Sequence, residues 1–343
     1  MSAIIDVARL AGVSKATASR ALSGRGYVSP ATRARVAQAA ADIGYVVSSN
    51  ASSLVTGQSK NVGVVMPFIN RWFFAELLEG IEEALIEADY DLTLYRLTAD
   101  PEQRRKVFEY FLVRKRVDAV IAVSVALTPA EVVRLRSLDK PLVGIGGPVE
   151  GMSTLSIDDE AAARLATEHL LSLGHARVVH LGGDLHAQMA FFVHAKRLAG
   201  YRAAMDADPR GLDARFATAE FTIEGGFRSA LGLLADPRTR PTAVFAASDE
   251  IAIGTILAAR QLGIAVPAEL SVAGIDGHEL APLFGLTTIE QHPRQQGRTS
   301  VGMVLEGLAP GGAPERTCTV PVDFAARGST TAPPPPATDQ AGG

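Results

Sequence analysis

The chain has 343 residues, of which 47% are hydrophobic and 20% are charged, close to the usage of ordinary globular proteins. Its length predicts about two domains, and no apolar run reaches the roughly 20 residues that a membrane-spanning helix needs. The N-terminus lacks the pattern of a secretory signal, so a cytoplasmic protein is expected. The single cysteine, Cys318, excludes an internal disulfide and a zinc site made of cysteines.

The net charge of −4 is unevenly distributed along the chain. Residues 1–60 contain seven Lys and Arg residues and two acidic residues, whereas the remainder contains 26 basic and 35 acidic residues. A basic N-terminal segment favours an anionic partner such as nucleic acid. The alternative is a charged surface that is simply solvated.

Three short helices are predicted in the basic segment. Residues 4–10 carry apolar side chains at helical spacing, and Ser14 is a suitable N-cap for a second helix over residues 15–22. A third helix is indicated by Ser29 followed by proline, a frequent start of a helix. The short connection between the first two helices predicts a helix-turn-helix.

The segment I-I-D-V-A-R-L-A-G-V-S-K-A-T-A-S-R-A-L-S-G, followed by G-Y-V-S-P-A-T-R-A-R-V, resembles the DNA-binding head of the LacI/GalR repressor family. The resemblance implies that the second helix enters the major groove, where Lys15 and Ala16 distinguish operators and Arg20 reaches a base. The paired donors of an arginine suit the acceptors of guanine. The side chains expected to contact phosphates are those of Ser14, Thr17, Ser19, Ser29 and Thr32. A helix-turn-helix used only for packing is the alternative.

Residues 46–60 are rich in serine, a composition typical of a flexible linker. The ending A-S-S-L-V-T-G resembles the hinge helix of the same family, which implies that this segment becomes ordered on operator DNA. Leu54 would then insert into the minor groove and bend the duplex, with Ala51 one helical turn earlier on the same face. A disordered spacer is the alternative.

From residue 61 onward, short β-rich runs alternate with helical patterns. Strands are expected at residues 62–66, 92–95, 119–123, 142–145, 177–181, 243–246 and 270–275. Helices are expected at residues 74–88, 102–115, 130–138, 160–173, 196–207 and 250–262. This alternation predicts an α/β fold with two parallel sheets, and therefore two lobes with a ligand cleft at the carboxyl ends of the strands.

The resemblance continues to about residue 330 through R-W-F-F-A-E-L-L-E-G-I-E, P-T-A-V-F-A-A-S-D-E-I-A-I-G and V-P-A-E-L-S-V-A-G-I-D. It implies a two-lobed, periplasmic-binding-protein-like effector domain in which the chain crosses three times, so that residues 292–320 return to the first lobe. The expected organisation is a helix-turn-helix head (1–45), a hinge (46–60), an effector-binding and dimerisation domain (61–328) and a disordered Pro/Gly tail (329–343).

The same resemblance implies where an effector binds. The positions that match the family's pocket are Phe73, Phe74, Arg197, Ser248, Asp249 and Asp276. The aromatic pair would stack on a ring, and Arg197 and Asp276 would donate to and accept from hydroxyl groups. The alternatives are that the aromatics belong to the core and that Arg197 and Asp276 form a salt bridge between the lobes.

Two departures from the family's pattern bear on the ligand. The strand at 142–145 ends in Gly146-Gly147, where the family has an Asp-Arg pair, so one acceptor of hydroxyl groups is missing. Trp72 and Arg71 are expected at the mouth of the cleft. A larger or acidic effector is the hypothesis that these departures suggest.

Catalytic chemistry is not indicated. The seven histidines show no metal-binding spacing, no G-x-S-x-G motif is present, and Cys318 lies in a β-rich run and is interpreted as structural. We therefore expect no enzyme activity, no metal, and no cofactor beyond a small carbohydrate-like effector. Some members of the family that the chain resembles append a leucine-heptad helix that joins dimers into tetramers, and since this sequence shows no such pattern, the resemblance implies a homodimer.

These features predict a sequence-specific transcriptional regulator, and specifically a repressor, whose operator affinity is controlled by an effector bound between two lobes. Two other classes stay open. The chain is alternatively a cytoplasmic solute-binding module with a vestigial head, or an α/β enzyme acting on a carbohydrate or nucleotide. The intact helix from Lys15 to Arg20 favours the regulator.

Overall fold

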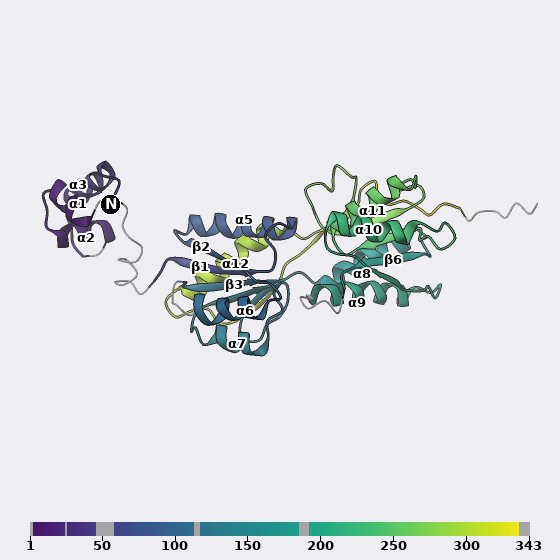
Figure 1. The fold of residues 1–343 in the computed structure, drawn as a ribbon, viewed down its shortest axis with the longest axis horizontal. Helices are drawn as coiled ribbons and strands as arrows, with labels where there is room; N and C mark the ends of the chain where they lie inside the picture. Colours follow the sequence, from purple (N-terminus) through teal and green to yellow (C-terminus); the bar gives the residue numbers. More distant parts are fainter. Residues whose placement is uncertain (1–2, 25, 46–57, 113–116, 185–191, 336–343) are drawn as a thin grey trace, which may run out of the picture. The chain divides into compact units, whose positions relative to one another are not determined.

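The structure is a computed structural model that describes residues 3–24, 26–45, 58–112, 117–184 and 192–335. These residues form two compact units. One unit extends to Asn61 and includes the few residues before Ala119, and the other contains the rest of the chain. The first unit is helical, and the second contains two sheets flanked by helices (Figure 1).

The first unit contains a small helical bundle, called the head. Its described helices are α1 (Ile4–Leu10), α2 (Lys15–Ser23) and α3 (Pro30–Asp42). Each contributes one fully buried apolar side chain to a shared core, namely Val7, Ala18 and Val36. Gly12, at the turn between α1 and α2, has a φ of 64°, which favours glycine. The three predicted helices are confirmed.

The second unit begins with the strands of one six-stranded sheet. These strands are β1 (Asn61–Met66), β2 (Asp91–Arg96), β3 (Ala119–Val123), β4 (Leu142–Ile145), β5 (Ser153–Ser156) and β11 (Thr317–Thr319). The helices around this sheet are α5 (Trp72–Glu87), α6 (Pro101–Lys106), the π-helical turn η1 (Val107–Phe111), α7 (Pro129–Arg136) and α12 (Pro293–Leu308). The strand order is β11-β5-β4-β3-β1-β2, and the pairs from β11 to β1 are parallel. We call this sheet and its helices the first lobe.

The second lobe contains another six-stranded sheet. Its strands are β6 (Val178–Gly182), β7 (Arg215–Thr218), β8 (Ala243–Ala246), β9 (Ser271–Asp276), β10 (Thr287–Glu290) and β12 (Asp323–Ala325). Its helices are α8 (Asp159–Ser172), α9 (Phe192–Ala207), α10 (Ile223–Leu234) and α11 (Asp249–Gln261). The order is β12-β10-β9-β8-β6-β7, parallel except where β12 meets β10. The predicted α/β fold with two parallel sheets is confirmed.

The chain passes between the lobes three times, after β5, after β10 and after β11. The second passage delivers α12 to the first lobe, where it packs along α5 (Figure 1). Gly80 and Gly297 lie where these two helices meet, and a Cβ atom on either glycine would overlap the backbone of the other helix. The predicted return of residues 292–320 to the first lobe is therefore confirmed.

The end of the described chain differs from the expected disordered tail. Ser329 is 1% exposed, and its Oγ accepts from the N–H of Thr287 at 2.8 Å and donates to the carbonyl of Val272 at 2.5 Å. Thr331 donates its N–H to the Oγ of Ser271. Placing the start of disorder at Ser329 was wrong, because these hydrogen bonds attach residues 329–331 to the second sheet.

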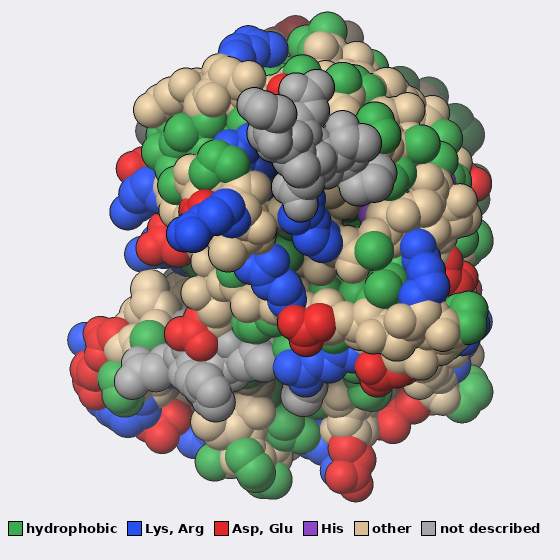
Figure 2. Space-filling model, turned by 90° about the vertical axis from the view of Figure 1, so that its right-hand side faces the viewer, with side chains coloured by type: hydrophobic (Ala, Val, Ile, Leu, Met, Phe, Trp, Pro, Cys, Tyr) green, Lys and Arg blue, Asp and Glu red, His purple; other side chains and the backbone are tan. Residues whose placement is uncertain are grey.

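The end surface of the second lobe carries both signs of charge. Figure 2 shows Lys and Arg side chains interspersed with Asp, Glu and neutral side chains on this face. No field of one sign dominates the described residues in this view, in contrast to the basic composition of residues 1–60. An extended anion such as DNA is therefore better matched by the head.

Candidate nucleic-acid interface and interlobe pocket

Helix α2 presents a polar face to solvent. Lys15, Ala16, Ser19 and Arg20 are exposed, whereas Ala18 on the opposite side is fully buried in the core of the head. Because Ala18 faces the core, the helical period places Lys15, Ala16, Ser19 and Arg20 together on the solvent side of α2. The structure thus brings together Lys15, Ala16 and Arg20, which were assigned to base recognition, and Ser19, which was assigned to a phosphate, and these contacts with DNA stay predictions.

The predicted phosphate ligands of the head are arranged around two helix starts. Ser14 caps α2 by accepting the N–H of Thr17 at 3.1 Å, and Ser29 caps α3 by accepting the N–H of Thr32 at 3.3 Å. The hydroxyls of each Ser–Thr pair are also hydrogen-bonded to each other at 2.9 Å. Helix N-termini favour anions, so both sites suit phosphate groups. Ala51 and Leu54, the predicted minor-groove residues, lie outside the described residues.

One exposed residue of the head was not predicted from the sequence. Tyr27, between α2 and α3, is 90% exposed, an unusual exposure for an aromatic side chain. Arg33 and Arg35 on α3 are also exposed. The signal was present in the G-Y-V-S-P motif, but the motif was interpreted only through its serine and proline.

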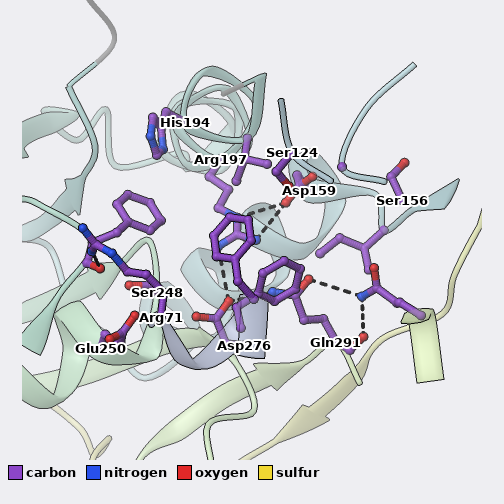
Figure 3. A pocket seen from close by; sticks show the side chains of 17 residues that line it. Arg71, Ser124, Ser156, Asp159, His194, Arg197, Ser248, Glu250, Asp276 and Gln291 are labelled. Carbon is purple, nitrogen blue, oxygen red and sulfur yellow. Dashed lines mark hydrogen bonds and ion pairs between the residues drawn. The ribbon is translucent and has the colours of Figure 1, made fainter. Parts of the chain in front are cut away.

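A cavity lies between the lobes and is called the interlobe pocket (Figure 3). Its apolar lining comes from Phe73, Phe74, Ile157, Val193 and Phe221. Its polar and charged lining comes from Arg71, Ser124, Ser156, Asp159, His194, Arg197, Ser248, Glu250, Asp276, Gln291 and Gln296. The mixture of aromatic and polar groups in this lining is that of a small-molecule site.

The two predicted aromatic residues, Phe73 and Phe74, belong both to the core of the first lobe and to the lining of the interlobe pocket. Phe73 and Phe74 lie in the first turn of α5, line the interlobe pocket and pack against the core of the first lobe. Their rings meet edge to face with centroids 5.4 Å apart. This packing holds both rings in place, which is what a stacking surface for a ligand ring requires.

Arg197, from α9, forms the most buried ion pair of the pocket. Its Nη2 lies 2.9 Å from Asp159 Oδ1, and both side chains are less than 5% exposed (Figure 3). The guanidinium also donates to the carbonyl oxygen of Ala247. The place of Asp159, the first residue of α8, in the pocket was not predicted. In the sequence, an acidic residue at this position only indicates a favourable start of a helix.

Asp276 lies beside Arg197 at the carboxyl end of β9. Its Oδ1 accepts from Gln291 Nε2 at 2.6 Å and lies 3.7 Å from Arg197 Nη1. Burial raises the pKa of this carboxyl to about 7, and the nearby Arg197 opposes the rise. Arg197 and Asp276 both belong to the second lobe, so the alternative of a salt bridge between the lobes is wrong.

Asp249 requires a correction. It is fully buried, and it does not belong to the lining of the interlobe pocket, unlike its neighbour Ser248, the N-cap of α11. Asp249 Oδ2 accepts the N–H groups of Gly277 and His278, and Oδ1 accepts from Thr288 Oγ1 at 2.6 Å. Its oxygens point to the turn after β9, so Asp249 positions Asp276 and the predicted contact with an effector is wrong.

The start of α5 also touches the second lobe. Arg71, the N-cap of α5, donates to the carbonyl oxygen of Phe221, and its guanidinium lies 4.6 Å from the ring of Phe68. Trp72 stacks on His278 with centroids 4.6 Å apart. The indole N–H of Trp72 is buried without a hydrogen-bond partner among the described residues. Arg71 and Trp72 therefore connect the lobes.

Glu250, the second residue of α11, is a further lining residue that sequence reasoning missed. Burial raises the pKa of its carboxyl to about 7, the charge of Asp276 adds to this rise, and Arg71 opposes it. The imidazole of His194 is neutral at pH 7, because burial lowers its pKa to about 4. The described residues contain no group of three His, Cys, Asp or Glu side chains suited to a metal ion.

Two family models match the chain. The model for bacterial regulatory proteins of the lacI family matches residues 3–48, and the model for a periplasmic binding protein-like domain matches residues 167–330. Within the described residues, no helix combines the length and apolar character that crossing a membrane requires. The two matches correspond to the head and to a segment that runs from within α8 to the end of the second lobe and includes α12 and β11 of the first lobe.

Known proteins resemble the chain over most of its length. It is 32% identical over 314 residues to the ribose operon repressor of Escherichia coli (strain K12), covering 90% of this chain and 93% of the relative. The lac repressor dimer bound to operator and the anti-inducer ONPF is 26% identical, with a TM-score of 0.83 and coverage of 96% and 99%. A complex of the transcriptional regulator CelR with cellobiose is also 26% identical, with a TM-score of 0.69 and coverage of 96% and 100%.

The fold, the head and the interlobe pocket define a DNA-binding transcriptional regulator with a small-molecule effector domain. The chain belongs to the lacI family of bacterial regulatory proteins.

Proposed function

We propose that this chain is a repressor whose affinity for operator DNA is set by a sugar-like effector in the interlobe pocket. The observation that carries the proposal is the pocket itself, in which aromatic rings and hydrogen-bonding groups from two lobes converge on the same chain as a helix-turn-helix head. A ligand that prefers one arrangement of the lobes would shift the population of DNA-binding molecules. No catalytic step is part of this proposal.

On DNA, helix α2 would occupy the major groove. Arg20 would donate two hydrogen bonds to a guanine, and Lys15 and Ala16 would set the preference at neighbouring base pairs. The capped starts of α2 and α3, with Ser14, Thr17, Ser19, Ser29 and Thr32, would fix the position on the phosphates. Leu54 and Ala51 would act in the minor groove as a wedge that bends the duplex.

In the pocket, Phe73 and Phe74 would stack on the apolar face of a sugar ring. Ser248 would exchange hydrogen bonds with hydroxyl groups, and Asp276, held by Gln291, would accept from them. Arg197 would hold Asp276 in place, and its N–H groups that do not bond to the protein would donate to hydroxyl groups of the ligand. The names of the relatives, which concern ribose and cellobiose, support a sugar as the class of ligand.

We further propose a homodimer, because a pair of heads related by two-fold symmetry would match a palindromic operator. The operator-bound dimer of the lac repressor supports this arrangement.

The test is a selection of bound duplexes from a random library with the full-length protein at a stated salt concentration. Enrichment of a palindrome with a flexible central pyrimidine–purine step is the expected result. The enriched duplex then serves as the probe in a screen of sugars and nucleosides for compounds that change its affinity.

Two results would contradict the proposal. Failure to enrich any sequence, with and without pooled sugars, favours a solute-binding module with a vestigial head. Conversion of a sugar or nucleotide to a product by the purified protein favours the α/β enzyme.

A further inference from the structure

The charged lining of the interlobe pocket has more carboxyl groups than cations. Its described carboxyls are Asp159, Glu250 and Asp276, and its guanidinium groups are Arg71 and Arg197. His194 adds no charge at pH 7, because burial lowers its pKa to about 4. Asp159 is paired with Arg197, and at pH 7 the carboxyls of Glu250 and Asp276 are partly ionised because burial raises their pKa values to about 7, so the described lining has no excess of positive charge to receive an anion.

Both guanidinium groups are already engaged by the protein. Arg197 is 4% exposed and paired with Asp159 at 2.9 Å. Arg71 donates to the carbonyl oxygen of Phe221 and lies over the ring of Phe68. A carboxylate or phosphate on a ligand would have to displace one of these contacts and bring a further negative charge into a partly buried site, which is unfavourable.

Glu250 is the lining carboxyl for which the described residues provide no hydrogen bond. Asp159 is paired with Arg197, and Asp276 accepts from Gln291, but no donor reaches Glu250. The charge of Arg71 already acts on this partly buried carboxyl, and a cation from outside that donates to its oxygens would add a charge-assisted hydrogen bond. The position of Glu250 in the first turn of α11 favours its ionised form when such a cation arrives.

The rest of the lining suits a polyhydroxylated ring that carries a cation. The faces of Phe73, Phe74 and Phe221 can stack on the C–H face of a sugar and attract a nearby positive charge. Ser124 and Ser156 add hydroxyl groups from the first lobe (Figure 3).

We propose that the interlobe pocket selects an aminated monosaccharide, whose protonated amine pairs with Glu250 beside Asp276, and that it discriminates against sugar acids and sugar phosphates. This inference rests on the proposed function and names the chemical class of its effector. It reverses the hypothesis of an acidic effector, because the charge of Arg71 is engaged by Phe221 and Phe68.

The experiment is a calorimetric titration of the full-length protein at pH 7 with matched sugars that differ in one group. One series is glucose, glucosamine and glucuronic acid, and the second is galactose, galactosamine and galacturonic acid. Because a charge-assisted hydrogen bond contributes about 1.5–3 kcal/mol, we expect the amino sugar to bind roughly 10- to 100-fold more tightly than the neutral sugar. Neutral or acidic members that bind equally or better, or a complete absence of binding, would overturn the proposal.

Two variants locate the effect. Glu250→Gln should reduce the affinity for the amino sugar to that of its neutral counterpart. The matched control is Glu160→Gln, because Glu160 is also the second residue of its helix, α8, but is exposed and outside the pocket. If Glu250→Gln retains the preference for the amine, or if Glu160→Gln loses it, the assignment of Glu250 is wrong.

A measurement without ligand tests whether the carboxyl of Glu250 is destabilised by burial in the folded protein. The pKa of Glu250 is raised above its ordinary value of 4.5 to about 7, so the folded protein binds more protons than the unfolded chain between these pH values. Stability from this group is complete below pH 4.5 and is lost as the pH rises through 7. Glu250→Gln should therefore have a higher melting temperature than the wild type at pH 8 and an equal one at pH 4. Equal melting temperatures at pH 8 would contradict an unpartnered carboxyl.

Operator binding separates this inference from the proposed function. If the protein binds its selected operator and responds to a neutral or acidic sugar, the inference fails and the regulator remains. If the protein binds no operator, the proposed function fails whatever the pocket prefers.

Discussion

The head and the interlobe pocket present their polar side chains in opposite ways. On α2, Lys15 and Arg20 are exposed, and among the described residues of the head Arg20 donates a hydrogen bond only to the carbonyl oxygen of Ala16, at 3.3 Å. In the pocket, Arg197 is 4% exposed and is bonded to Asp159 and the carbonyl of Ala247, which lie far from it in the sequence. The head thus keeps its donors free for a partner, whereas the pocket uses most of its own to build the site.

This difference predicts which substitutions affect folding and which affect binding. Removing a free donor removes an intermolecular contact and leaves the fold intact. Removing one member of a buried network leaves its partners buried without a hydrogen bond or an opposite charge. The free energy of unfolding therefore falls even in the absence of a ligand. The comparison is tested by substituting one arginine from each region.

The largest effect is expected for Arg197→Ala. The substitution leaves Asp159 and Asp276 buried without the cation that both approach, and breaking a buried pair in this way costs about 3–5 kcal/mol. Unfolding by urea, followed by circular dichroism, measures the loss. The control is Arg228→Ala, whose pair with Glu224 is exposed and contributes about 0–1 kcal/mol. Equal losses in the two variants would show that the pocket network does not stabilise the fold.

A smaller effect, confined to binding, is expected for Arg20→Ala. Losing a bidentate contact to guanine should weaken specific operator binding by about 1–3 kcal/mol, with little change in nonspecific binding. Because Arg20 is exposed, the free energy of unfolding should stay within about 0.5 kcal/mol of the wild type. Fluorescence anisotropy with the selected operator and a scrambled duplex measures both affinities. A uniform loss on both duplexes would assign Arg20 to phosphates.

The fold was predictable where local pattern decides the structure. The strands at 119–123, 142–145 and 243–246 are observed with the predicted bounds, because each is a continuous apolar run. Helix α10 was missed, because Gly225 and Gly226 lower its helical propensity. The structure explains them, since a Cβ atom on Gly226 would overlap the backbone of α11. Only the packing partner shows why glycine is needed there.

The site was predictable to the same extent. Ser14 and Ser29 were identified as caps because the serine oxygen and the backbone N–H group that donates to it lie three residues apart in the sequence. Asp159 pairs with a residue 38 positions away, and the contact of Arg71 with Phe221 spans 150 positions. Such pairings depend on the folded structure and not on local sequence. Asp249 was assigned to the effector for the same reason, because its neighbours in space could not be identified from the sequence.

The smallest effect concerns Ser14, which belongs to both sides of the comparison. It is exposed like Lys15 and Arg20 of α2, yet its Oγ already accepts the N–H of Thr17. Ser14→Ala removes the cap and should destabilise the head by about 1 kcal/mol, whereas Ser14→Gly should cost only a few tenths of a kcal/mol. Hydrogen exchange of the backbone amides of α2, measured in the full-length protein as the temperature is raised, gives the loss of stability in each variant.

The same two variants separate capping from phosphate contact, because both lack the hydroxyl and only one lacks an adequate cap. If Ser14 also donates its hydroxyl to a phosphate, operator affinity should fall in Ser14→Gly as well, although its helix is stable. If affinity falls only in Ser14→Ala, Ser14 acts through the helix, and the anion is bound by the backbone N–H groups at the start of α2. In that case the head, like the pocket, uses a side chain to shape the site and leaves the contact to other groups.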